Sequence, residues 1–316
     1  MGSKIKLLVS GLKAYYITKK EIIKAVDGVN FEITNNESLG VAGESACGKS
    51  TLGAALLRTL QFPGKIVEGS ILLDGIDILK ASDSEFDKYI RWKKIAMIFQ
   101  GAMNALDPVY TIGQQMTELM HQHQLKENLE ETISESLLRV GLDSSITKNY
   151  PHELSGGMKQ RVVIAMALLL GPDIVIADEP TTSLDVLVQA QIINLLKDLK
   201  QKGTTVILIT HDLAVISEVA DRIAIMYAGQ IVELSNASEI YSTPRHPYTQ
   251  ALISAIPKLH SDDVQIHIIK GSPPDLHQLP TGCRFYERCP HAMEICKKDP
   301  PEFRNNAGYV RCWLYE

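Results

Sequence analysis

The segment Gly43–Thr51, GESACGKST, constrains the fold more than any other part of the chain. It matches the pattern Gly-x4-Gly-Lys-Ser, and it lies between an apolar run at Leu39–Val41 and a helical pattern at Ser50–Leu60. A glycine-rich loop between a buried strand and a helix lets backbone N–H groups surround the phosphates of a nucleotide. The sequence therefore predicts a mostly parallel α/β sheet with a phosphate loop at the end of one strand.

The residues of this loop have separate expected roles. Lys49 would place a positive charge near the β and γ phosphates, the Ser50 hydroxyl would bind Mg²⁺, and Thr51 would lie towards the α-phosphate. If position 46 needs a positive φ angle, an alanine there costs about 1 kcal/mol relative to glycine. A cysteine beside Lys49 is either a reactive thiol or a small, tolerated residue. The segment expected to surround the phosphates is Gly43, Glu44, Ser45, Ala46, Cys47 and Gly48.

Two carboxylates follow a second apolar run, Ile174–Ala177. A buried strand would carry both to the edge of the sheet at which ligands bind in open α/β folds. We expect Asp178 to hold Mg²⁺ through water. Glu179 would act as the general base that polarises the attacking water, a role that contributes roughly 10²–10⁴ in rate.

The periodicity of the chain indicates three regions. Weak alternation in residues 7–33 and 70–76 predicts a small, partly antiparallel sheet, and apolar strands alternate with helices between residues 96 and 210. We interpret residues 1–235 as a nucleotide-binding domain, with 101–160 as an inserted helical lobe. Residues 236–316, which are rich in proline, form a loop-rich C-terminal extension. Because such a segment buries little apolar area by itself, we expect a covalent cross-link or a bound metal to stabilise it.

Composition excludes several classes of protein. The chain has 316 residues and a formal net charge of −5, so no general basic field favours nucleic acid as a partner. The N-terminus lacks the pattern of a signal peptide. The longest apolar run, Val162–Leu170, has nine residues, whereas a membrane helix needs about 20. If the protein acts at a membrane, other chains must cross it.

A third motif, LSGGMKQR at Leu154–Arg161, lies between the first two. The three motifs together resemble the ATP-binding-cassette (ABC) superfamily. The resemblance implies a P-loop NTPase fold with a RecA-like core, an antiparallel β subdomain and an inserted helical subdomain. It also implies that Ser155, Gly156 and Gly157 begin a helix that faces the γ-phosphate held by a second cassette. Each ATP site would then need a second ATPase subunit, which family practice suggests is a related heterodimer partner.

The same resemblance assigns roles to further residues. Gln100 matches the family's Q-loop, which contacts Mg²⁺ or the water and reports nucleotide state to the helical lobe. The segment Ser183-Leu184-Asp185 matches the D-loop at the dimer interface, and His211 matches the switch histidine that contacts the γ-phosphate. Adenine should stack on an aromatic residue of the N-terminal strands. We choose Tyr16, with Tyr15 as the alternative, because the two point to opposite faces of a strand.

The C-terminal extension narrows the resemblance. Segments PRHPYT at 244–249, GSPPDL at 271–276 and GCRFYERCPHAMEIC at 282–296 resemble the ATPases of dipeptide and oligopeptide permeases. The resemblance implies a peripheral subunit at the cytoplasmic face of the membrane, which hydrolyses ATP with Mg²⁺ to drive peptide import. Its implied partners are two transmembrane permease subunits and, indirectly, an extracytoplasmic solute-binding protein, with no nucleic acid.

Rival interpretations stay open at this stage. In related transporters, the same kind of ATPase drives the import of oligosaccharides or nickel chelates. A soluble ABC ATPase acting on DNA or the ribosome is disfavoured, because the chain has neither long coiled coils nor a second cassette. A redox-sensing interaction protein is a further alternative.

Four of the five cysteines lie in the last 34 residues of the chain. The C-x2-C spacing of structural zinc knuckles is absent, and widely spaced thiolates suit a larger object such as a 4Fe–4S cluster. Some members of the permease family carry such a cluster. Zinc, disulfides and free thiols are the alternatives. The expected ligands are Cys283, Cys289, Cys296 and Cys312.

Overall fold

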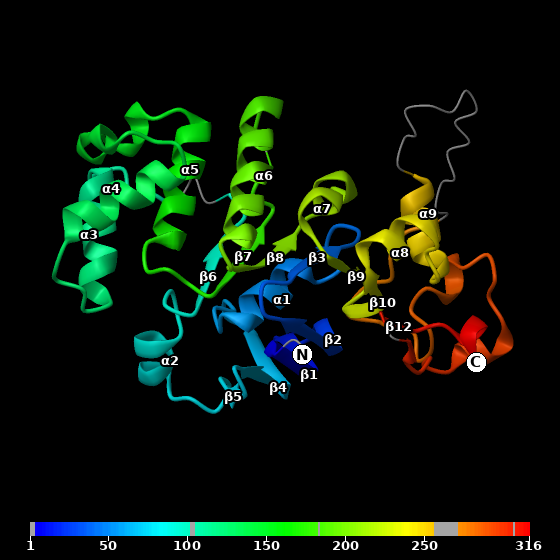
Figure 1. The fold of residues 1–316 in the computed structure, drawn as a ribbon. Helices are drawn as coiled ribbons and strands as arrows, with labels where there is room; N and C mark the ends of the chain where they lie inside the picture. The colour runs from blue at the N-terminus through cyan, green and yellow to red at the C-terminus, as the bar shows by residue number, and fades with distance from the viewer. Residues whose placement is uncertain (1–3, 102–104, 183, 256–270, 306) are drawn as a thin grey trace, which may run out of the picture. The chain divides into compact units, whose positions relative to one another are not determined.

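A computed structural model describes residues 4–101, 105–182, 184–255, 271–305 and 307–316. The chain has a mixed α/β fold, as predicted, with antiparallel and parallel sheets. It separates into two compact units, one formed by Met1–Leu79 with Ile209–Glu316 and the other by Lys80–Leu208 (Figure 1). The expected domain bounds at 101–160 and 236–316 stay an interpretation.

The first unit contains the start and the end of the chain. Its N-terminal elements are β1 (Ile5–Ile17), β2 (Ile22–Thr34), β3 (Ser38–Ala42), α1 (Lys49–Leu56), β4 (Gly64–Leu73) and β5 (Ile76–Asp77). Its C-terminal elements are α7 (Leu213–Val219), β9 (Arg222–Tyr227), β10 (Gln230–Asn236), α8 (Ala237–Ser242), α9 (Pro247–Ser254), η4 (Tyr286–Arg288), η5 (Glu294–Lys297), β11 (Phe303–Asn305), β12 (Gly308–Val310) and η6 (Trp313–Tyr315).

Two sets of strands organise this unit. Strands β2, β1, β4 and β5 form an antiparallel sheet in that order, with Asp74 and Gly75 at positive φ in the turn between β4 and β5. In the second set, β3 pairs with β9 in parallel, and β9, β10, β12 and β11 follow in antiparallel order. All five residues of β3 are buried, as expected for a strand covered on both faces.

The C-terminal extension is more regular than predicted. Two of its segments, α8 and α9, are helical, and β12 extends the sheet through pairing with β10. The Tyr309 hydroxyl donates a hydrogen bond to the carbonyl oxygen of Asn30 in β2, at 2.8 Å. The extension is therefore packed against the N-terminal strands of the same unit.

The second unit combines three strands with a group of helices. Its elements are α2 (Asp83–Tyr89), β6 (Ile95–Ile98), α3 (Ile112–Gln122), α4 (Leu129–Arg139), η2 (Ser144–Lys148), η3 (Pro151–Glu153), α5 (Gly156–Leu168), β7 (Ile174–Asp178), α6 (Val186–Gln201) and β8 (Thr205–Ile209). Strands β6 and β7 are parallel neighbours, and β8 follows β7. Helices α3, α4 and α5 pack on one another as a helical lobe (Figure 1).

The helical pattern of the sequence predicts a helix over Thr117–Gln124, and α3 begins five residues earlier, at Ile112. Thr111 and Gln114 form a capping box, in which the Thr111 hydroxyl accepts from the Gln114 amide and the Gln114 side chain accepts from the Thr111 amide. These bonds satisfy two of the otherwise unpaired groups at the helix start. In contrast, α1 ends at Leu56, four residues before the predicted end, and Arg58 just beyond it has a φ of 53°.

Candidate functional site

The phosphate loop of the first unit joins β3 to α1 as the sequence predicts. Two of its glycines are required by close contacts as well as by positive φ. A Cβ on Gly43 would lie 2.1 Å from the carbonyl oxygen of Met226, and a Cβ on Gly48 would lie 1.9 Å from that of Ala25. Ala46 has a φ of 61°, so the left-handed conformation considered for this position is present. The loop therefore lies close to the backbone of Met226 near its start and to that of Ala25 near its end.

Lys49 and Cys47 are both buried within this loop. The Lys49 ammonium donates to the carbonyl oxygens of Gly43 and Glu44, each at 2.9 Å, so it spans the mouth of the loop. Burial raises the pKa of the Cys47 thiol, although the charge of Lys49 works in the other direction. A buried thiol with a raised pKa is unreactive, which favours the interpretation of Cys47 as a small, tolerated residue.

A pocket beside the loop distinguishes the two candidate tyrosines. Tyr16 lines this pocket with Lys49, Ser50 and Thr51, and its hydroxyl lies 3.4 Å from the Thr51 hydroxyl. Tyr15 instead donates a hydrogen bond of 2.6 Å to Asp27. The position of Tyr16 suits a nucleobase contact, and its role stays a prediction.

Leu276 of the C-terminal extension also lines this pocket. The Lys24 amide in β2 donates to the Leu276 carbonyl oxygen at 3.4 Å and holds the segment in place. Residues 271–276 carry the family resemblance, but nothing in the sequence alone relates this leucine to a site more than two hundred residues away.

His211 follows β8 and lies in the part of the chain that belongs to the first unit. The amide of the preceding residue, Thr210, donates to the carbonyl oxygen of Val41 in β3 at 3.2 Å. Since β3 leads directly into the phosphate loop, this bond places the exposed His211 at the same end of the strand as the loop.

In the second unit, β7 carries the two predicted carboxylates. Asp178, the last residue of the strand, is 3% exposed, and Glu179 is half-buried. Glu179 has a φ of 49° and accepts a hydrogen bond from the Thr182 hydroxyl at 2.8 Å. A left-handed conformation at a residue other than glycine costs about 1–3 kcal/mol and is concentrated at functional sites. The backbone strain therefore marks Glu179 as a functional candidate.

The LSGG motif forms the start of α5 in the same unit. The Ser155 hydroxyl accepts from the Met158 amide at 3.3 Å and caps the helix, and both Ser155 and Gly156 are exposed. Gly157 has a packing role that the sequence does not reveal. A Cβ at this position would lie 2.9 Å from a methyl group of Val188 in α6. The exposed helix start is open to a ligand or a second molecule.

The remaining predicted residues of the second unit lie at element ends. Gln100 is exposed and follows β6, and Asp185 caps α6 by accepting from the Val188 amide at 3.0 Å. Ser183, the first D-loop residue, lies outside the described residues. Val186 and Leu187, directly after Asp185, are 79% and 77% exposed.

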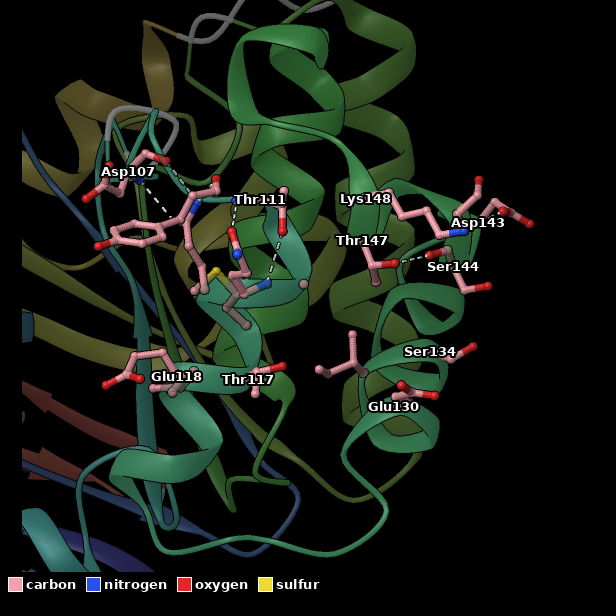
Figure 2. A pocket seen from close by; sticks show the side chains of 18 of the residues that line it. Asp107, Thr111, Thr117, Glu118, Glu130, Ser134, Asp143, Ser144, Thr147 and Lys148 are labelled. Atoms are coloured by element: carbon pink, nitrogen blue, oxygen red, sulfur yellow. Dashed lines mark hydrogen bonds between the residues drawn. The ribbon is translucent and has the colours of Figure 1, made fainter.

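The helical lobe contains a groove of about 1340 Å³. Figure 2 shows that its labelled side chains come from α3, α4 and η2, from the residues that cap α3 and η2, and from Asp107 before α3. Four carboxylates line it against one lysine, Lys148, and the acidic residues are Asp107, Glu118, Glu130 and Asp143. An acidic groove of this kind suits a partner segment that carries basic residues.

Four cysteines line one pocket in the C-terminal extension, namely Cys283, Cys289, Cys296 and Cys312. All five cysteines of the chain are free thiols. Burial raises the pKa of Cys283 to about 12, and the neighbouring cysteines act in the same direction. Among the described residues, no group of three or more His, Cys, Asp or Glu side chains is arranged to hold a metal ion. The predicted cysteines thus lie around one pocket, and the described residues contain no preformed metal site.

Comparisons with known proteins agree with this geometry. A family model described as "ABC transporter" matches residues 26–182, and one described as "Oligopeptide/dipeptide transporter, C-terminal region" matches 232–296. The oligopeptide transport ATP-binding protein AppD of Bacillus subtilis is 45% identical over 98% of this chain and 97% of its own length. This chain belongs to the ABC ATPases of the oligopeptide and dipeptide transport family.

Other relatives of this ABC ATPase cover it equally well. The dipeptide transport ATP-binding protein DppD of Caldanaerobacter subterraneus is 43% identical over 99% of the chain and 98% of its own length. The oligopeptide transport protein OppD of Escherichia coli is 43% identical over 96% and 91%. A dimeric post-hydrolysis structure of the ATP-binding cassette MJ0796, bound to ADP and phosphate, matches with a TM-score of 0.65 and 31% identity over 73% of this chain and 98% of that one. The ABC fold and the ATPase class expected from the sequence are thereby confirmed.

Proposed function

We propose that this chain is the ATP-hydrolysing subunit of an ABC importer for dipeptides or oligopeptides. The observation that carries the proposal is the near full-length similarity to peptide transport ATP-binding proteins, which includes the C-terminal extension. The extension matters because the cassette alone occurs in ABC proteins of many functions. Among the described residues, no helix is long and apolar enough to cross a bilayer. Two permease subunits would therefore supply the membrane path.

In the proposed mechanism, the phosphate loop binds the triphosphate through its backbone N–H groups and Lys49. Bound Mg²⁺ would neutralise charge on the β and γ phosphates, and Ser50, Gln100 and Asp178 would hold it. Glu179 orients and polarises the attacking water, and its hydrogen bond from Thr182 fixes the carboxylate. His211 contacts the γ-phosphate, and Tyr16 stacks on the adenine.

A second cassette completes the site in this proposal. Ser155 and Gly156 are exposed at a helix start, where backbone N–H groups and the helix dipole favour a phosphate. The apolar side chains of Val186 and Leu187, next to Asp185, are also exposed. A facing cassette would cover both features. We infer a related ATPase chain as the partner, as in heterodimeric importers.

The acidic groove of the helical lobe is the proposed contact for the permease subunits (Figure 2). Closure of two cassettes over ATP would move the lobes together, and hydrolysis with product release would reopen them. This role places the chain at the cytoplasmic face of the membrane, with the solute-binding protein acting through the permease.

A 4Fe–4S cluster held by Cys283, Cys289, Cys296 and Cys312 is the finer part of the proposal. Its support is the convergence of four thiols on one pocket. The cluster would link the proline-rich extension into one lobe, and no feature of the chain calls for electron transfer.

Uptake of a radiolabelled tripeptide by cells that lack this chain tests the proposed cargo. Wild-type chain should restore uptake, whereas Glu179→Gln, expressed to the same level, should not. If the restored strain takes up nickel chelates or oligosaccharides and no peptide, the cargo assignment is wrong and the ATPase assignment stands.

A further inference from the structure

Two arginines of the C-terminal extension lie at or near the phosphate loop, and each is adjacent in sequence to a pocket cysteine. Arg284 follows Cys283, and Arg288 precedes Cys289. Both arginine side chains are 7% exposed. Burying an arginine is costly unless the charge is paired, so contacts made at this burial are specific ones.

Arg288 binds the side chain of a phosphate-loop residue. Its guanidinium donates to both carboxylate oxygens of Glu44, at 2.8 and 3.0 Å, and to the Tyr227 hydroxyl at 3.1 Å. The group also lies over the rings of Tyr227 and Phe285. Bidentate arginine–carboxylate pairs are among the strongest and most directional side-chain contacts. The orientation of Glu44 is therefore set by the extension.

The backbone of Glu44 is held from the same side. Its amide donates to the Tyr248 hydroxyl of α9 at 2.9 Å, while its carbonyl oxygen accepts from Lys49. Tyr248 is fully buried and packs on Tyr227 and Phe285. The side chain, the amide and the carbonyl oxygen of Glu44 therefore all form hydrogen bonds.

Arg284 contacts residues that lie next to the end of the loop. It donates to the carbonyl oxygen of Ala228 and pairs with Asp27. The next residue, Gly229, donates its amide to the Cys47 carbonyl oxygen at 2.9 Å. The extension therefore supports the loop both near its start, at Glu44, and near its end, at Cys47.

We propose that Arg288 is a positioning residue for ATP. Through Glu44, this arginine couples the phosphate loop to residues 283–312, the segment that carries the four pocket cysteines. The cysteine-bearing segment then regulates the affinity for nucleotide. If this segment becomes less ordered, Arg288 releases Glu44, and the empty phosphate loop can leave its phosphate-binding conformation. By reciprocity, bound ATP must stabilise the cysteine-bearing segment. The inference rests on the proposed ATP site.

The test measures ATP binding to the purified full chain by titration of a fluorescent ATP analogue. Arg288→Gln should raise the Kd about 3- to 10-fold, because the bidentate pair that orients Glu44 is lost. Arg288→Lys should recover part of this change. Arg304→Gln, which removes an exposed arginine of the same extension that pairs with Glu302, should leave the Kd unchanged. The double variant with Glu44→Gln and Arg288→Gln should bind the ATP analogue no more weakly than the weaker-binding of the two single variants.

Hydrogen exchange supplies a readout that a purely structural role would not change. ATP analogue should slow amide exchange in residues 283–298 of the wild type, and Arg288→Gln should abolish that protection. Unchanged Kd together with retained protection in Arg288→Gln would overturn the inference. If the wild type itself bound no ATP, and Lys49→Ala behaved identically, the proposed ATP site would be wrong instead.

Discussion

Replacing Ala46 by glycine should stabilise the protein, against the usual effect of such a change. Ala46 is an exposed loop residue with a φ of 61°, in the left-handed region. That conformation costs an alanine about 1–2 kcal/mol relative to glycine. Glycine, in turn, raises the entropy of the unfolded chain by about 0.4–1 kcal/mol. The difference is a net gain of roughly 0.5–1 kcal/mol in the free energy of unfolding.

A matched control lies eight residues further on. Ala54 is within α1 at a helical conformation, so Ala54→Gly should destabilise the protein by about 1 kcal/mol. Urea midpoints and Tm, measured on both variants without nucleotide, should shift in opposite directions, by roughly 1 °C in Tm. A loss of stability in Ala46→Gly similar to that in Ala54→Gly would refute the argument from backbone strain.

Three further changes probe separate parts of the account. Tyr16→Ala should weaken ATP binding by roughly 1–3 kcal/mol in a fluorescence titration, while Tyr15→Phe should leave it unchanged. If Tyr16→Ala bound ATP as tightly as the wild type, Tyr16 would not be the nucleobase contact. Gly157→Ala should destabilise the chain by about 1–3 kcal/mol in urea unfolding through its contact with Val188, and Val188→Ala should restore most of that loss; no rescue would argue against the contact. Cys289→Ser should lower the iron content of anaerobically purified protein, and a wild type without iron would exclude the cluster.

The phosphate loop and its flanking elements were predictable from the sequence because they are local. The glycine spacing, the preceding apolar strand and the following helix lie within twenty residues. The same is true of Asp178, which ends β7, and of Glu179, which follows it. Their positions follow from strand ends, which short apolar runs define well.

Other features depended on contacts that no local pattern encodes. Arg288 and Glu44 are 244 positions apart, and a bidentate pair cannot be inferred from either residue alone. The packing role of Gly157 against Val188 depends on how α5 meets α6. The early start of α3 could have been predicted, since Thr111 and Gln114 have the spacing of a capping box.

The central claim is that two cassettes enclose ATP between the phosphate loop of one chain and the LSGG helix start of the other. Sedimentation of the Glu179→Gln variant with its cassette partner tests it most directly, because slowed hydrolysis should trap the closed state. ATP should drive association, and adding Ser155→Arg to this chain, with the same change at the signature serine of the partner, should abolish it. Association that is indifferent to ATP, or that survives Ser155→Arg, would contradict the account.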